Sequence, residues 1–209
     1  MSILDQLSSQ TGDRTESSNR KVVTLCLENP DLLVEISSGL EKKDAAIVAD
    51  CAEVLTQIAE VHPDWVAPFA PQLTLLLSHK NTRVRWEAMH ALALVAALTP
   101  ETIASIFPQL RDMLRSDHSV IVRDHATDAI GRYASTSRTA AQVAFPILKE
   151  MLTLWEGKQA GHALLGLAQV ANQLPAARAE LRQIANGYAA FPRPVVRKAA
   201  QALLKAIDK

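Results

Sequence analysis

The sequence contains few of the residues that cross-link, stack or turn a small protein. Only two cysteines, Cys26 and Cys51, occur in 209 residues, which excludes a disulfide framework and the paired-cysteine spacing of a zinc site. Aromatic residues make up 4% of the chain, and glycine occurs 7 times. Because Ala, Leu and Val supply the apolar content instead, helices are favoured over sheets. We predict an all-α protein in which both cysteines are buried and inert.

Long hydrophobic runs are also absent. The longest, such as residues 91–98, are far shorter than the roughly 20 residues that span a bilayer. The first ten residues lack the basic start and apolar core of an export signal. We therefore predict a cytoplasmic protein with no membrane partner.

Neither sign of charge dominates, because 22 Lys and Arg balance 22 Asp and Glu. The balance is nevertheless uneven along the chain. Residues 1–78 hold 12 acidic and 5 basic side chains, whereas residues 79–209 hold 10 acidic and 17 basic ones. Such asymmetry can orient a protein toward a charged partner without identifying that partner.

A Val-Arg pair followed by Ala recurs in the sequence, with its arginine at Arg85, Arg123 and Arg197. Arg123 follows Arg85 after one period of about 37 residues, and Arg197 follows Arg123 after two such periods. Weaker copies of the motif are expected one period before Arg85, with Val48 at the arginine position, and one period after Arg123, with Ala160 at that position. Spacing that is regular over this length indicates an internal structural repeat.

Pro71, Pro108 and Pro146 follow the same period. Each lies near the start of an apolar segment that precedes the Val-Arg segment. The apolar residues within 84–95 recur at helical spacing, so both segments of a period are predicted to be helices. The prolines should bend the first helix of each pair, because each removes one backbone donor.

Two helices in about 37 residues, a proline in the first, and the pattern D-x-x-x-x-V-R-x-x-A entering the second resemble HEAT repeats. The resemblance covers about residues 30–207 and implies a right-handed α-α solenoid, or superhelix, of about five repeats. In HEAT repeats the Asp and Arg form a structural ladder, which implies structural roles for Arg85, Asp117, Arg123 and Arg197. Only the copy with Asp117 and Arg123 has both the Asp and the Arg of the ladder. The repeated arginines are therefore expected to be freer than is usual in HEAT repeats.

The chain is predicted to begin with an N-terminal helical cap at 1–29, followed by a repeat array at 30–209. The cap should hold one short helix from Ser2 and a second helix over about 17–27, joined by a polar loop. The predicted repeats are 30–61, 62–98, 99–136, 137–174 and 175–209.

The second helices usually line the concave face of a HEAT solenoid, so equivalent positions on them should share one surface. The candidate concave-face binding residues are Trp86, Glu87, His90, His125, Asp128, Arg132, His162 and Gln169. The turns between first and second helices carry cations that would form a basic edge, namely Lys42, Lys43, Lys80, Arg83, Arg115, Lys158 and Arg193. Cations at these helix ends are also favoured by the helix dipole, by about 0.3–1 kcal/mol each.

Two enzymatic interpretations compete with a binding role. Histidines near Glu87 and Asp128 could ligate a metal, and some HEAT-type enzymes, such as deoxyhypusine hydroxylase, hold iron with adjacent His-Glu pairs. That adjacent pair is absent from this sequence. Trp86, with Asp124 at the same position of the next repeat, is similar to the aromatic and acidic cleft of HEAT-like DNA glycosylases. The predicted concave positions, however, lack most of the Lys and Arg that DNA binding needs.

We therefore predict a non-catalytic scaffold, without a metal or other cofactor, that binds another protein through its concave face or basic edge. One alternative is a HEAT-fold enzyme, similar to an alkylpurine DNA glycosylase or an iron-dependent hydroxylase. The other is a HEAT protein that binds nucleic acid without catalysis.

Overall fold

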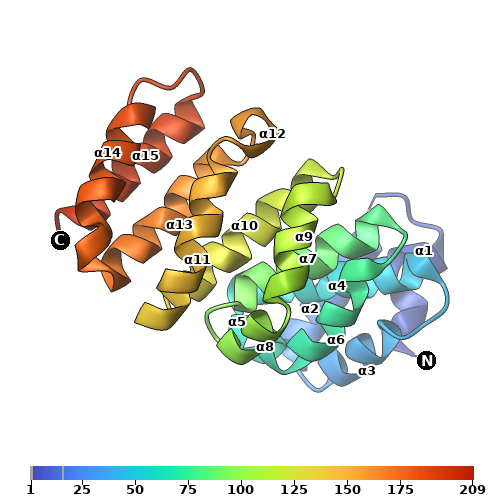
Figure 1. The fold of residues 1–209 in the computed structure, drawn as a ribbon. Helices are drawn as coiled ribbons and strands as arrows, with labels where there is room; N and C mark the ends of the chain where they lie inside the picture. The colour runs from blue at the N-terminus through green and yellow to red at the C-terminus, as the bar shows by residue number, and fades with distance from the viewer. Residues whose placement is uncertain (1, 16) are drawn as a thin grey trace. The chain divides into compact units, whose positions relative to one another are not determined.

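The computed structural model describes residues 2–15 and 17–209, and within these ranges it contains helices and turns but no β-strand. The contacts divide the chain into two compact units, unit 1 (Met1–Thr102) and unit 2 (Ile103–Lys209). Figure 1 shows the helices of each unit packed side by side in successive pairs. The prediction of an all-α fold is confirmed for the described residues.

Unit 1 begins with short helices and ends with the long helix that carries the first clear Val-Arg motif. In chain order its elements are η1 (Ile3–Gln6), α1 (Ser8–Thr11), α2 (Ser17–Glu28), α3 (Leu32–Gly39), α4 (Ala45–Val61), α5 (Pro63–Val66), η2 (Ala67–Phe69), α6 (Ala70–Leu75), η3 (Leu76–Ser78) and α7 (Thr82–Val95). Helix α8 (Pro100–Ser105) crosses the boundary between the units.

Helix α4 is the centre of unit 1 and packs against α2, α3 and α7. Asp44 caps its N-terminus by accepting a hydrogen bond of 2.8 Å from the backbone N–H of Ala46. The helix is buried on several sides, which is why apolar residues occur nearly all round it. Cys26 on α2 and Cys51 on α4 are both buried and unpaired, as predicted.

Unit 2 is also built of helices that pack side by side. Its elements after α8 are α9 (Phe107–Ser116), α10 (Val120–Ala134), α11 (Arg138–Met151), α12 (Leu154–Gly157), α13 (Ala160–Gln173), η4 (Pro175–Ala177), α14 (Arg178–Tyr188) and α15 (Pro194–Ile207). Helices α10, α13 and α15 pack against one another in sequence, with α11 against α10 and α13, and α14 against α13 and α15. Each predicted repeat range contains a first helical segment and a second helix, but the repeat boundaries themselves stay a proposal.

The backbones of α10 and α13 approach closely where two glycines face each other. A Cβ atom added to Gly131 would lie 2.7 Å from the Cα of Gly166, which is closer than packed atoms can come. Only glycine at both positions allows this approach, and neither position requires an unusual backbone conformation. At this point the contact between the two helices is therefore formed by backbone.

The three repeated prolines do not act alike. Pro71 follows a break at η2, and Pro108 follows a break at Ile106, so the first helix is interrupted in both of these pairs. Pro146 instead lies inside α11, which continues from Arg138 to Met151. Buried residues on both sides of Pro146 hold the two halves of α11 in place, so the loss of one hydrogen bond does not end the helix.

The turn before α13 has a conformation that the sequence did not predict. Trp155, Glu156 and Gly157 are consecutive residues in the left-handed region, with φ of 54°, 59° and 69°. For the two non-glycine residues this costs roughly 1–2 kcal/mol each. Trp155 is half-buried, and its indole N–H donates to the carbonyl of Leu114 at 2.8 Å.

The repeated arginines each reach back to the turn that precedes their own helix. Arg85 donates to the carbonyl of His79, and Arg197 donates to that of Phe191, both at 2.9 Å. Arg123 makes the same contact with the carbonyl of Asp117. In each case the acceptor lies at the same offset before the arginine. The expectation that these arginines would be freer than usual was wrong, because a backbone carbonyl accepts whatever the side chain at that position.

Candidate functional site

A groove of about 620 Å³ lies in unit 2 between α10, α13 and α15. We call it the α10–α13–α15 groove. Its lining residues are Asp128, Gly131, Arg132, His162, Leu165, Gly166, Ala168, Gln169, Asn172, Ala202, Lys205, Ala206 and Lys209. Small residues make much of this surface, whereas amides and cations project around it. Asp128, Arg132, His162 and Gln169, four of the predicted concave-face residues, are thus brought together.

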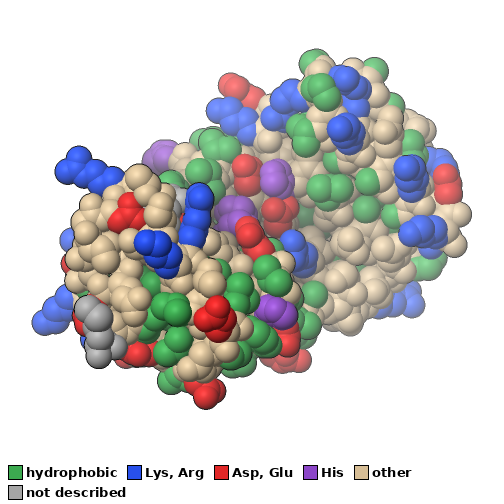
Figure 2. Space-filling model, turned by 180° about the vertical axis from the view of Figure 1, so that it is seen from behind, with side chains coloured by type: hydrophobic (Ala, Val, Ile, Leu, Met, Phe, Trp, Pro, Cys, Tyr) green, Lys and Arg blue, Asp and Glu red, His purple; other side chains and the backbone are tan. Residues whose placement is uncertain are grey.

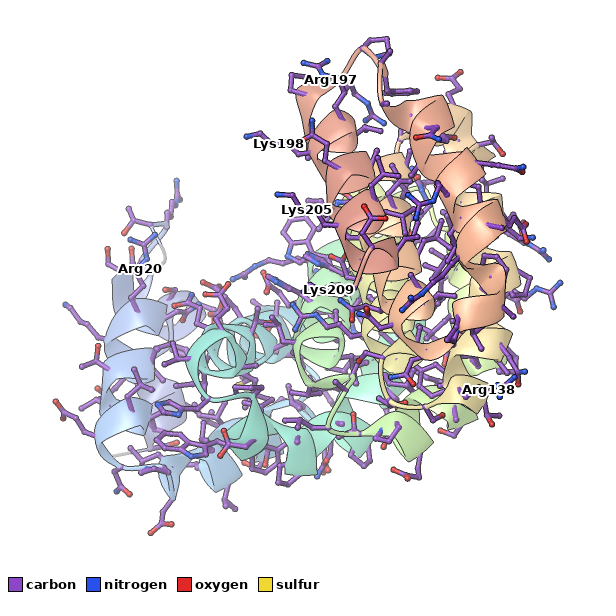
Figure 3. The ribbon with its side chains drawn as sticks, turned by 90° about the vertical axis from the view of Figure 1, so that its left-hand side faces the viewer. Arg20, Arg138, Arg197, Lys198, Lys205 and Lys209 are labelled. Atoms are coloured by element: carbon purple, nitrogen blue, oxygen red, sulfur yellow. The ribbon has the colours of Figure 1, made fainter. Side chains whose placement is uncertain are left out.

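The cations on α15 form a stripe along one side of the helix. Lys198, Lys205 and Lys209 are separated by seven and four positions, which places them on the same face. Figure 3 shows the side chains of Lys198 and Lys205 projecting from the same side of α15, with Lys209 just beyond the end of the helix, and all three residues are exposed. No described residue forms an ion pair with any of them.

A histidine and two carboxylates lie beside this groove. Nδ1 of His162 is 2.7 Å from Oδ1 of Asp128, and its Nε2 is 3.9 Å from Oδ2 of Asp124. The hydrogen bond that Asp128 accepts raises the pKa of His162 above its ordinary value and outweighs burial, which would lower that pKa. Burial raises the pKa of Asp124, although Gln159 donates a hydrogen bond of 3.0 Å to that carboxylate. The Asp128 charge is therefore offset within the protein whenever His162 is protonated.

A smaller hollow of about 300 Å³ adjoins the groove and shares His162 and Leu165 with it. We call it the valine hollow. Three aliphatic residues around it are unusually exposed: Val120 at 42%, Leu165 at 48% and Val195 at 62%. Asp124, Lys158, Gly161, Arg193 and Val196 complete its lining. Exposed aliphatic residues that gather around one hollow are typical of a binding surface.

The remaining predicted concave-face residues do not line this groove. His125 is a half-buried residue of α10. Trp86, Glu87 and His90 lie on α7 in unit 1 and are also half-buried. The indole N–H of Trp86 donates to Oε1 of Glu87 at 2.6 Å, and burial raises the pKa of Glu87 to about 7.

Asp50 and Glu53, the acidic residues of α4 at equivalent positions, are buried and form part of a polar network. Arg83 contacts both carboxylates, at 2.7 Å and 2.6 Å. From the N-terminal segment, the backbone N–H of Ser9 donates to Asp50 at 2.8 Å, and the amide of Asn19 donates to Glu53 at 2.9 Å. Burial alone would raise the pKa of Asp50, but these hydrogen bonds lower it. The network fastens α1 and α2 to α4 and α7.

Three of the seven cations predicted to form a basic edge are already engaged within their own unit. Arg83 turns toward the buried carboxylates, and Arg115 makes a two-pronged contact with Glu150 at 2.8 Å and 2.7 Å. Arg193 donates to the carbonyls of Gly157 and Lys158. The exposed members are Lys42, Lys43, Lys80 and Lys158. In Figure 2 the cationic side chains are scattered among hydrophobic and other side chains, not gathered into a continuous strip.

Sequence reasoning missed the residues that give the α10–α13–α15 groove its charge. Lys205 lies between the helix positions equivalent to the predicted concave-face residues, and Lys209 and Asn172 lie beyond the last of these positions. The spacing of seven and four between Lys198, Lys205 and Lys209 was the available signal.

Among residues 2–15 and 17–209, no group of three or more His, Cys, Asp or Glu side chains is arranged to hold a metal ion. No helix in the described part of the chain is long and apolar enough to cross a membrane.

The sequence model of the HEAT-like repeat matches residues 82–133, which contain α7 to α10. This stretch is a HEAT-like repeat. The match confirms the resemblance at the place where the Val-Arg motif is clearest. No curated protein sequence matches the chain.

Solved structures extend the likeness from this HEAT-like repeat to nearly the whole chain. A designed armadillo repeat protein has a TM-score of 0.73 at 19% identity, covering 98% of both chains. A second one, in complex with the peptide (KR)4, has a TM-score of 0.74 with the same identity and coverage. The archaeal HEAT-like repeats protein from Thermococcus onnurineus NA1 has a TM-score of 0.57 at 15% identity, covering 92% of this chain and 93% of its own. The fold is therefore an α-helical repeat solenoid, as predicted.

Proposed function

We propose that this protein is a non-catalytic scaffold that binds a polypeptide segment of another protein in the α10–α13–α15 groove. The observation that carries the proposal is the convergence of unpaired polar side chains on a smooth surface. Lys205 from α15, Lys209 just beyond the end of α15, and Gln169 and Asn172 from α13 line one groove. None of these four side chains has a hydrogen-bond or ion-pair partner among the described residues.

The surface of the groove suits a close-fitting chain. Gly131 and Gly166 add no side chain to the lining between α10 and α13, and Ala202 and Ala206 add only methyl groups from α15. A bound polypeptide can approach such a surface closely, while the longer side chains at its margins supply the polar contacts. Grooves between helices with a few convergent polar groups are common ligand sites.

The solved structures support a peptide as the kind of partner. One of the designed armadillo repeat proteins with this fold is in complex with the peptide (KR)4. The binding of a basic peptide is a property of that designed protein alone. The groove of unit 2 instead presents cations of its own, so its partner should differ in charge.

The proposal is tested by selecting displayed random dodecapeptides on the immobilised full-length chain. Enriched peptides are then synthesised with a fluorescent label, and their binding is measured by anisotropy. We expect saturable binding that Ala206→Trp weakens at least about tenfold, because the indole would fill the groove. Arg138→Glu, at an exposed position at the start of α11, should leave affinity unchanged within about twofold.

Thermal melting of both variants shows whether the scaffold is intact. If no peptide is enriched over the blank matrix, or if folded Ala206→Trp binds the enriched peptides as tightly as the wild type, the proposed function is wrong.

A further inference from the structure

We infer that the bound segment is extended and acidic, with an aliphatic residue about four to six positions away from its acidic residues. The inference rests on the proposed function and specifies its partner. The aliphatic side chain would occupy the valine hollow, and the acidic residues would face the lysines of α15.

The charge of the segment follows from the cations that line the groove. Arg132, Lys205 and Lys209 all contribute to its lining, and Lys198 continues the stripe toward the valine hollow. Asp128 is the only acidic residue of this lining, and His162 lies 2.7 Å from it. A segment with Asp or Glu therefore finds complementary charge, whereas a basic segment would meet repulsion.

The aliphatic residue follows from the valine hollow. Val120, Leu165 and Val195 keep between 42% and 62% of their surface exposed, although the helices that carry them are otherwise well packed. The hollow is about 300 Å³, at the lower end of the usual range for ligand pockets and large enough for one aliphatic side chain. Burying a side chain there would remove apolar surface from water on both partners.

The spacing between the two features comes from helix geometry. Val195 borders the hollow, Lys205 lies ten positions further along α15, and Lys209 lies two residues beyond the end of the helix. At a rise of 1.5 Å per residue the separation of Val195 and Lys205 is roughly 15 Å, and Lys209 lies further on. An extended chain covers about 3.3 Å per residue, so a segment parallel to α15 needs about four to six residues to connect them.

The amides of Gln169 and Asn172 favour an extended segment over a helical one. Each amide can both donate and accept hydrogen bonds. An extended peptide brings unpaired backbone N–H and C=O groups, whereas a helix has already satisfied most of its own. Two amides without a partner in the described structure therefore match the backbone of an extended chain.

Nucleic acid fits these features less well than an acidic peptide. His162, which is held by Asp128, is the only ring among the residues that line the groove or the valine hollow, so a row of bases would find little to stack on. The aliphatic hollow has no counterpart in a phosphate backbone.

The sequences of peptides enriched on the full-length chain test the inference separately from the function. We expect enriched peptides to carry Asp or Glu four to six positions from Leu, Ile, Val or Met. Enrichment of basic or uncharged peptides that still bind the groove would overturn the inference and leave the proposed function standing. If peptides fail to be enriched but a single-stranded oligonucleotide binds with an affinity that falls as salt rises, both proposals are wrong.

A charge-reversed variant provides the sharper test. Lys205→Glu with Lys209→Glu should weaken the best acidic peptide on the order of tenfold at about 0.1 M salt, and a matching peptide with Lys in place of its acidic residues should regain that affinity. Arg138→Glu, the matched reversal outside the groove, should change neither affinity. Val195→Asp should weaken the acidic peptide while keeping the melting temperature, because the residue is exposed. Equal binding of the acidic peptide to the wild type and the reversed variant would contradict the inference.

Discussion

The guanidinium of Arg123 lies over the indole ring of Trp155, with its central carbon 4.1 Å from the ring centroid. Arg123 is only 2% exposed, so this contact is largely shielded from water. The same guanidinium donates to the carbonyl of Asp117 at the end of the preceding helix. One side chain therefore joins α10 to two turns, and the second of these turns has the left-handed backbone at Trp155.

Arg123→Ala should lower the free energy of unfolding by about 2–4 kcal/mol, because the variant loses a shielded cation–π contact and a charged hydrogen bond and leaves a carbonyl without its donor. Urea denaturation measures the change. Arg85→Ala should cost less, because Arg85 is only half-buried. Equal stability of Arg123→Ala and the wild type would show that the arginine is not structural.

Arg83→Met should destabilise unit 1 by about 3 kcal/mol, because Asp50 and Glu53 would stay buried without their cation. The value lies at the lower end for buried pairs, since 34% of the Arg83 side chain is exposed. Lys80→Met, at an exposed site in the turn before the same helix, should stay within about 0.5 kcal/mol of the wild type. Chemical denaturation of the two variants tests the difference, and a comparable loss in both would refute the network as its cause.

Gly131→Ala should destabilise the protein by about 1–3 kcal/mol even though alanine is the better helix former. The added methyl would lie 2.7 Å from the Cα of Gly166 and force α10 and α13 apart. Gly187→Ala is the matched control, because nothing lies within 4 Å of the added methyl on α14. That variant should gain about 0.5–1 kcal/mol. Thermal melting that moved both variants in the same direction would contradict the close approach.

Glu87→Gln should change how stability depends on pH. Burial raises the pKa of Glu87 to about 7 from an ordinary value of 4.5. The folded protein therefore binds this proton more readily than the unfolded chain, and the wild type loses stability as pH rises from about 4.5 to about 7. Glutamine stays neutral and still accepts from Trp86, so the variant should gain about 1–2 kcal/mol relative to the wild type across that interval. Urea titrations at pH 5, 6, 7 and 8 measure this gap. Glu101→Gln at an exposed site should show no gap.

Much of the fold followed from the period of the sequence. The spacing of Arg85 and Arg123, and of the three prolines, was enough to predict pairs of helices because stacked repeats must bury the same face in each copy. The turn at Trp155 was not predictable in this way. Gly157 alone marks a turn, but Trp and Glu ordinarily avoid the left-handed region, and contacts with residues far away in sequence place them there.

The candidate site was predicted less completely than the fold. The positions of Asp128, Arg132, His162 and Gln169 on their helices were sufficient to group them, since helix register determines which face a residue occupies. The direction of a long cationic side chain is not determined by register. Arg83 was expected at an exposed edge, yet it turns inward because two buried carboxylates of α4, Asp50 and Glu53, lie within its reach. Lys205 and Lys209 were not predicted because neither is at a helix position equivalent to the predicted concave-face residues.

Because Cys26 and Cys51 are buried, the reactivity of their thiols reports local opening of the protein. Both thiols are fully shielded, and burial raises their pKa to about 11 and about 12, so neither reacts readily in the folded state. Both belong to unit 1, whereas residues 103–209 contain no cysteine. The rate at which a thiol reagent labels the protein therefore measures the opening of unit 1 alone. Comparing this rate with a global unfolding signal would show whether the two units unfold together or one at a time.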